Sequence, residues 1–115
     1  MSLLTNEILH AIARVAVRVG PPVRAKKIVD AVGRLLPPLS LGEAMRAAQE
    51  LARSGTCLTQ ALTIAARLPD AEVVLGSEGP GERGFTAHAW VDRNGTVIGA
   101  GGASRIELTR LGGAR

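Results

Sequence analysis

The only cysteine of the chain, Cys57, stands where a helix is predicted to begin. It lies in the stretch SGTCLTQAL, directly after Thr56, a residue type that favours the N-cap position. In the first turn of a helix, unpaired N–H groups and the positive end of the dipole stabilise an anion, which favours a thiolate. The same N–H groups could bind the oxyanion of a tetrahedral intermediate. The position therefore suits a nucleophile.

A nucleophilic cysteine needs a base, and the chain has two histidines, His10 and His88. His10 falls in an amphipathic helical pattern, where we expect a surface or half-buried side chain. His88 stands in the middle of a predicted strand between two alanines, which leave an imidazole accessible. Trp90 follows on the same face and is expected to line the cleft and exclude water. These residue types alone also fit a packing cysteine and an unrelated histidine.

The pattern around these residues predicts an α+β fold, with a helical half over about residues 3–68 and a small antiparallel sheet over about 71–110. The first helix has an apolar face, made by Leu4, Ile8, Ile12, Val15 and Val19. The second, bracketed by proline pairs, has Val23, Lys27 or Ile28, Val32 and Leu35 on one side. A capping box of Ser40 and Glu43 opens the third. The fourth runs from about Thr56 to about Leu68.

The second half alternates strands and turns. AEVVLG is a short strand, GSEGPGER is expected to be a loop, and GFTAHAWVD alternates between two faces. Asn94-Gly95 signals a two-residue hairpin turn into TVIGAGG. SRIELTRL is a last short strand or a loop. If the sheet packs on the fourth helix, the buried residues should be Leu58, Leu62, Ala65, Val73, Val91 and Ile98.

Composition narrows the class of function. The 115 residues are 46% hydrophobic but only 2% aromatic, so stacking on nucleic-acid bases has almost no support. The net charge of +4 is spread along the chain, and no stretch has the length or apolarity of a membrane span. A single cysteine suits a reducing cytoplasm, and the N-terminus is a poor signal peptide. One cysteine and two distant histidines give no metal site, and no cofactor motif is present.

The two motifs together resemble a known family. CLTQAL carries Cys57, Leu58, Ala61 and Leu62, and HAWVD carries residues 88–92 before a turn with glycine. These two motifs, and the spacing between Cys57 and His88, resemble those of the transglutaminase-like B2 proteins of bacterial lasso-peptide biosynthesis. The resemblance implies a single transglutaminase-like, papain-like cysteine protease domain over residues 1–115.

The resemblance also implies an activity. B2 proteins of this kind remove the leader from a ribosomally made precursor peptide, often with a separate B1-type leader-recognition protein and an ATP-dependent cyclase. Cys57 would attack the carbonyl at the leader–core junction. His88 would take the thiol proton and later protonate the leaving amine.

One expected residue is absent. The family has an aspartate about a dozen residues after the histidine, and the place beside His88 in the predicted hairpin falls at Ala100 and Gly101, which have no carboxylate. Asp92 is on the same face but about 13 Å along the strand. Ser104, Glu107 or a backbone carbonyl could orient the imidazole, or the pair could act as a dyad. The alternative is a non-catalytic scaffold of the same pathway with a degenerate Cys–His site.

Overall fold

A computed structural model describes residues 2–51, 56–81, 84–99 and 105–112. Four helices come first: α1 Ser2–Val19, α2 Pro22–Gly33, α3 Leu41–Leu51 and α4 Cys57–Arg67. Four strands follow: β1 Ala71–Gly81, β2 Gly84–Arg93, β3 Thr96–Ile98 and β4 Arg105–Leu111. The strands form one antiparallel sheet in the order β3-β2-β1-β4. The predicted α+β fold is confirmed.

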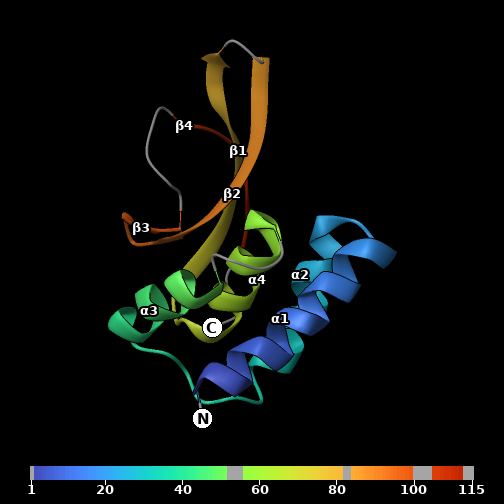
Figure 1. The fold of residues 1–115 in the computed structure, drawn as a ribbon, viewed down its shortest axis with the longest axis vertical. Helices are drawn as coiled ribbons and strands as arrows, with labels where there is room; N and C mark the ends of the chain where they lie inside the picture. Colours follow the sequence, from blue (N-terminus) through green and yellow to red (C-terminus); the bar gives the residue numbers. More distant parts are fainter. Residues whose placement is uncertain (1, 52–55, 82–83, 100–104, 113–115) are drawn as a thin grey trace.

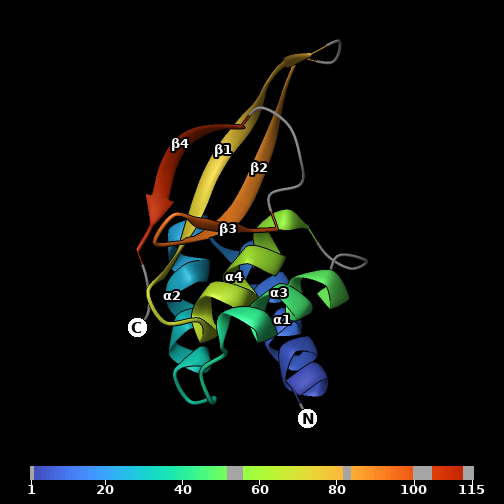
Figure 2. The ribbon, with the colours of Figure 1, turned by 90° about the vertical axis from the view of Figure 1, so that its left-hand side faces the viewer.

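The helix α4 occupies the centre of the molecule. It contacts β1 and β2 on one side and the three other helices on the other (Figure 2). The upper part of the β1–β2 ribbon extends beyond the helices (Figure 1). None of the described helices has the length and apolarity needed to cross a bilayer.

The aliphatic core lies where α4 meets the sheet. Five of the six predicted core residues are fully buried: Leu62, Ala65, Val73, Val91 and Ile98. Leu58 is only partly buried and packs at the edge of this cluster. The face of α4 that meets the sheet was therefore predicted correctly, except at its first turn.

The β2–β3 hairpin has the predicted turn but a shorter ladder than expected. Asn94 and Gly95 both have positive φ, at 51° and 91°, as a two-residue turn that follows the sheet twist requires. Pairing runs from Arg93–Thr96 only as far as Val91–Ile98. Gly99 then takes a φ of 79° and ends β3. The predicted place beside His88, at Ala100 and Gly101, lies outside the described residues.

The strand β1 is longer than the sequence indicates. The segment GSEGPGER was expected to be a loop, yet β1 continues to Gly81 and pairs with β2 from Ala71–Arg93 to Gly81–Gly84. Glycine and proline are depleted in strands, but backbone hydrogen bonds to a long partner strand can override that preference. An irregularity of register between Glu78 and Gly81 accommodates the extra residues.

The apolar patterns of α1 and α2 do not mark the faces that are buried. In α1 the core side consists of Leu9, Ala13 and Ala16, whereas the stripe identified in the sequence is largely exposed. In α2, Val23 of the predicted side is 53% exposed, and Leu35, which lies beyond the end of α2 at Gly33, is 83% exposed. Small residues let the helices approach closely, which decides the face that packs.

Candidate active site

The helix that carries the cysteine begins at Cys57, as predicted. Thr56 is the N-cap: its hydroxyl accepts a hydrogen bond of 3.3 Å from the Thr59 N–H. In return, the Thr59 hydroxyl accepts one of 3.0 Å from the Thr56 N–H. This reciprocal cap fixes the first turn of α4 and, with it, the position of the sulfur.

Two N–H groups of this first turn remain open. An α-helix leaves its first N–H groups without intrahelical acceptors. The cap takes those of Thr56 and Thr59, and among the described residues no acceptor is found for those of Cys57 and Leu58. Because these two donors lie at the residue that carries the sulfur and at the next one, they are suited to bind an oxyanion formed there.

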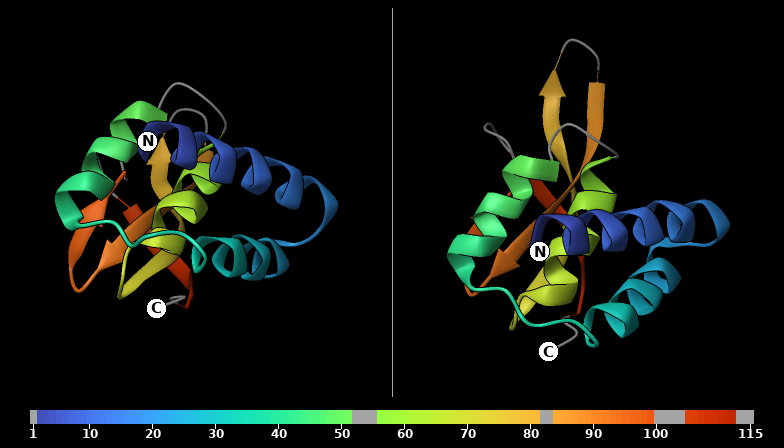
Figure 3. Two further views of the ribbon diagram at one scale, coloured as in Figure 1. Left: turned by 90° about the horizontal axis from the view of Figure 1, so that it is seen from below. Right: turned by 60° about the horizontal axis from the view of Figure 1, so that its bottom comes forward.

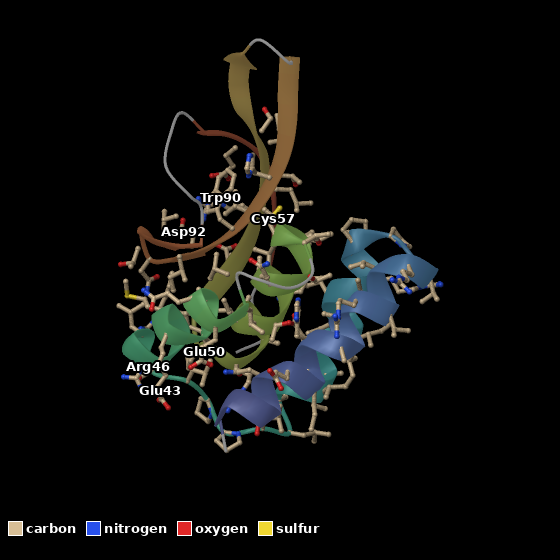
Figure 4. The ribbon with its side chains drawn as sticks, in the orientation of Figure 1. Glu43, Arg46, Glu50, Cys57, Trp90 and Asp92 are labelled. Atoms are coloured by element: carbon tan, nitrogen blue, oxygen red, sulfur yellow. The ribbon has the colours of Figure 1, made fainter. Side chains whose placement is uncertain are left out.

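The sulfur of Cys57 lies against the backbone of β2. The Ala89 N–H donates a hydrogen bond to Sγ at 3.3 Å. In an antiparallel ladder, residues two apart point their N–H groups to the same side. The N–H of Ala89 therefore points to the side of β2 on which β3 lies, as the N–H groups of Val91 and Arg93 do. The pairs described for β3 end at Val91–Ile98, and beyond them the N-terminus of α4 lies against this side of β2 at Ala89. Figure 4 shows Cys57 at this end of α4.

His88 precedes the residue that binds the sulfur. The length of the intervening bonds places its Cα within about 6 Å of Sγ. Ala89 and Val91 pack in the main core, so by the two-residue period of the strand His88 and Trp90 project from the other face. His88 is half-buried. The backbone of His88 is therefore close to the sulfur, whereas its side chain leaves β2 on the face opposite the core.

Trp90 is buried, with 5% of its surface exposed, and packs on its cross-strand partner Val74. It also lines a small cavity together with Cys57 and Gln60, and Figure 4 shows it next to Cys57. The cavity measures about 10 Å³, room for about one water molecule. Sequence reasoning assigned Gln60 no role, although its place one turn after Cys57 was the available signal.

A wider groove adjoins this cavity between α3 and β3. It measures about 280 Å³ and shares Ala48, Ile98 and Gly99 with the cavity. Met45 on α3 and Val97 on β3 add exposed apolar surface to its walls. This groove was not predictable from the sequence, because its two walls come from segments about fifty residues apart.

The third member of a catalytic triad is not identified among the described residues. Ala100, Gly101 and Ser104 lie outside them. Gly76 of β1 pairs with His88 of β2 on one side and with Glu107 of β4 on the other.

Neither nearby carboxylate is bound to His88. Both carboxylate oxygens of Glu107 accept hydrogen bonds from Arg110, at 2.6 and 2.7 Å, and these bonds lower the pKa of Glu107. Asp92 accepts a hydrogen bond from the Gly95 N–H and forms a 2.7 Å ion pair with Arg110. Asp92 therefore has the structural role expected of a residue at a strand end.

The other histidine, His10, is hydrogen-bonded to the helix that carries Cys57. His10 was expected to be exposed or half-buried, and this prediction is wrong: it is 2% exposed, and its Nε2 is hydrogen-bonded to the Thr59 hydroxyl at 2.8 Å. Desolvation, and then the charge of Arg14, lower the pKa of His10. A second buried link joins Asn6 of α1 to Arg67 at 2.7 Å. Both links hold α4 on α1.

Comparison with known families matches residues 8–111 to the transglutaminase-like superfamily. The matched range extends from the first half of α1 to the end of β4, and so includes both Cys57 and His88. Comparisons with curated proteins and with solved structures find no match.

Proposed function

The chain belongs to the transglutaminase-like superfamily, and we propose that it is a cysteine peptidase with Cys57 as nucleophile and His88 as base. The superfamily commonly includes cysteine peptidases and transglutaminases. The observation that carries the proposal is the hydrogen bond from the Ala89 N–H to the sulfur. It holds the sulfur at a helix N-terminus, next in space to the backbone of His88, and the proposed mechanism requires the His88 imidazole to reach the sulfur from there.

The reaction uses groups already described. His88 takes the proton of the Cys57 thiol, and the sulfur attacks the substrate carbonyl to form a C–S bond. The open N–H groups of Cys57 and Leu58 stabilise the oxyanion. The intermediate collapses with cleavage of the C–N bond, and protonated His88 gives its proton to the leaving amine. Water then attacks the thioester, its proton passes to His88, and the C–S bond breaks to release a carboxylic acid.

The groove between α3 and β3 is the proposed approach of the substrate. It is continuous with the cavity beside the sulfur, and its aliphatic walls suit a peptide segment. The cavity itself admits about one water, which matches the water that the second step consumes. A scissile peptide bond must therefore reach the sulfur from the groove side.

The proposed substrate is the leader–core junction of a ribosomally made lasso-peptide precursor in the bacterial cytoplasm. The support is the resemblance of CLTQAL and HAWVD to the B2 proteins of that pathway. By the same resemblance, a B1-type recognition protein and the ATP-dependent lasso cyclase are proposed partners.

Cleavage of the precursor peptide encoded beside the gene tests this function. The products are identified by mass spectrometry, with and without the recognition protein encoded there. We expect a single cut, no product from Cys57→Ala, and a loss of about 10²-fold or more from His88→Ala. Leu108→Ala, a change at an exposed position on β4, is the control and should cut normally. Cleavage by Cys57→Ala at the normal rate would rule out this peptidase mechanism, and a folded protein that never cuts would favour the scaffold alternative.

A further inference from the structure

The apolar stripe of α1 that faces away from the core consists of Ile8, Ile12, Val15 and Val19. Ile8 is 55% exposed, Val15 61% and Val19 67%. Their spacing of four, three and four residues puts them on one side of the helix. The opposite stripe already supplies the buried side of α1, so this one has no partner within the described residues. An aliphatic stripe of this regularity is unusual on an exposed helix face and marks an interaction surface.

The stripe forms one wall of a groove with α2. The groove, which we call the α1–α2 groove, measures about 380 Å³ and is lined only by apolar side chains: Ala11, Ile12, Val15, Ala16, Val19 and Ile28. The two helices lie side by side on the side of the molecule away from β3 (Figures 1 and 3). The groove is therefore remote from the opening between α3 and β3.

Positive charge is concentrated in the segment that forms the groove. Residues 8–34 contain six basic residues and one acidic residue, a net charge of +5, which exceeds the +4 of the whole chain. The acidic residue, Asp30, is buried and paired with buried Lys26. The other charged residues of this segment are exposed and positive: Arg14, Arg18, Arg24, Lys27 and Arg34. Lys27 and Arg34 line a separate pocket between α2 and the end of β4. The exposed Glu7 of α1 precedes the segment.

We propose that the α1–α2 groove binds an acidic amphipathic helix of a partner protein. Aliphatic side chains of the partner helix would enter the groove, and its carboxylates would meet the exposed arginines of α1 and α2, namely Arg14, Arg18 and Arg24. The described residues that line the groove all come from α1 and α2, which disfavours addition of a strand as the binding mode. This inference does not depend on the proposed peptidase activity.

The same observations disfavour two other occupants. A second copy of this surface would bring two net charges of +5 together, which repel each other. A membrane interface favours tryptophan and tyrosine at the headgroup level, whereas the groove has no aromatic side chain. An acidic aliphatic helix satisfies both the charge and the apolar lining.

A designed peptide tests the proposal directly. The probe is a fluorescein-labelled peptide of about 18 residues with leucines at helical spacing and glutamates elsewhere, and a companion has lysine in place of every glutamate. We expect the glutamate peptide to raise its anisotropy on binding and the lysine peptide to remain free. Binding should weaken as sodium chloride is raised, because salt screens the surrounding charges. Hydrogen exchange should show new protection in residues 8–19.

Variants separate the two contributions. Val15→Asn with Val19→Asn removes the apolar surface without adding charge, and Arg14→Gln with Arg18→Gln removes two cations. Each pair should weaken binding at least about tenfold. All four positions are exposed, so circular dichroism should show an unchanged fold. Leu108→Asn makes the same polar change at a residue of β4 that is 71% exposed, and it should bind like the parent.

Four results would overturn the proposal. They are no binding of the glutamate peptide, equal loss in Leu108→Asn, equal binding of the lysine peptide, and binding of vesicles of phosphatidylglycerol in place of the peptide. A dimer in sedimentation that Val15→Asn with Val19→Asn dissociates would assign the groove to a second copy instead.

Discussion

The sulfur of Cys57 accepts its hydrogen bond from the backbone N–H of Ala89, at 3.3 Å. The contact joins the first residue of α4 to β2, at the residue next to His88. Because the donor is a main-chain group, the side chain at position 89 does not determine it. The position of β2 against α4 does.

This contact predicts a reactive thiol. In the proposed mechanism His88 takes the thiol proton, and the Ala89 N–H donates a hydrogen bond to the sulfur. At about pH 6, iodoacetamide should therefore modify Cys57 about tenfold faster in the folded protein than in the chain unfolded in urea. Mass spectrometry of timed samples gives both rates from the same residue, so the unfolded chain is its own control. Slower modification of the folded protein would contradict the prediction.

The bond between His10 and Thr59 predicts a dependence of stability on pH. Burial lowers the pKa of His10 from its ordinary 6.5, so the unfolded chain binds more protons between the two values. The contribution of His10 is complete above about pH 6.5 and is lost as the pH falls through the lowered pKa. Urea unfolding of the parent and of His10→Gln at a series of pH values measures it.

The free energy of unfolding is compared between the parent and His10→Gln at each pH, so that effects common to both proteins cancel. Carboxylates also lower stability at acid pH, but they do so equally in both chains. The advantage of the parent over His10→Gln should therefore shrink as the pH falls. A difference that stays constant from about pH 7.5 to about pH 5 would mean that His10 titrates in the folded state as in the unfolded state.

The close approach of α2 and α4 predicts a sensitive glycine. A Cβ at Gly33 would lie 2.6 Å from both the Cβ and the carbonyl oxygen of Ala66. Gly33→Ala should therefore lower the free energy of unfolding by about 1–3 kcal/mol, in spite of the better helix propensity of alanine. Chemical denaturation measures the change.

Gly42 of α3 is the matched control, because a Cβ there meets nothing within 4 Å. Gly42→Ala should be neutral or stabilise by up to about 1 kcal/mol. Equal effects of the two substitutions would show that propensity, and not the contact with α4, decides the outcome.

Asp92 and Glu72 should contribute unequally to stability, because the carboxylate of Asp92 is buried and that of Glu72 is more exposed. Both approach Arg110, at 2.7 and 3.3 Å, but only Asp92 is buried and also binds the Gly95 N–H. Asp92→Ala should lower the free energy of unfolding by about 1–3 kcal/mol. Glu72→Ala should have less than half that effect, because solvent screens its ion pair. Thermal unfolding compares them, and a larger loss in Glu72→Ala would refute the assignment.

Local chemistry was readable from the sequence. Thr56 caps the helix through a residue three positions away, so the start of α4 at Cys57 was predictable. Asn94-Gly95 forms its turn within four residues for a similar reason. The alternation of β2 likewise gave the faces of Val91 and Trp90.

The length of the strands depended on their partners. The glycines before Gly81 lie in β1 because β2 pairs with them, and the ladder of β3 stops at Ile98 because Gly99 turns the chain away. Hydrogen bonds between segments decide both limits. The conformational preferences of a single segment therefore do not predict where β1 and β3 end.

The sequence by itself determined that Cys57 begins a helix, that His88 lies in a strand and that the fold is α+β, because caps, turns and periodicity act over a few residues. Only the tertiary structure decided that Ala89 binds the sulfur, that His10 is buried against Thr59, and that the stripe of Val15 and Val19 faces outward. These depend on which of two apolar stripes packs. That choice is set by how closely small residues such as Gly33 and Ala66 let the helices approach.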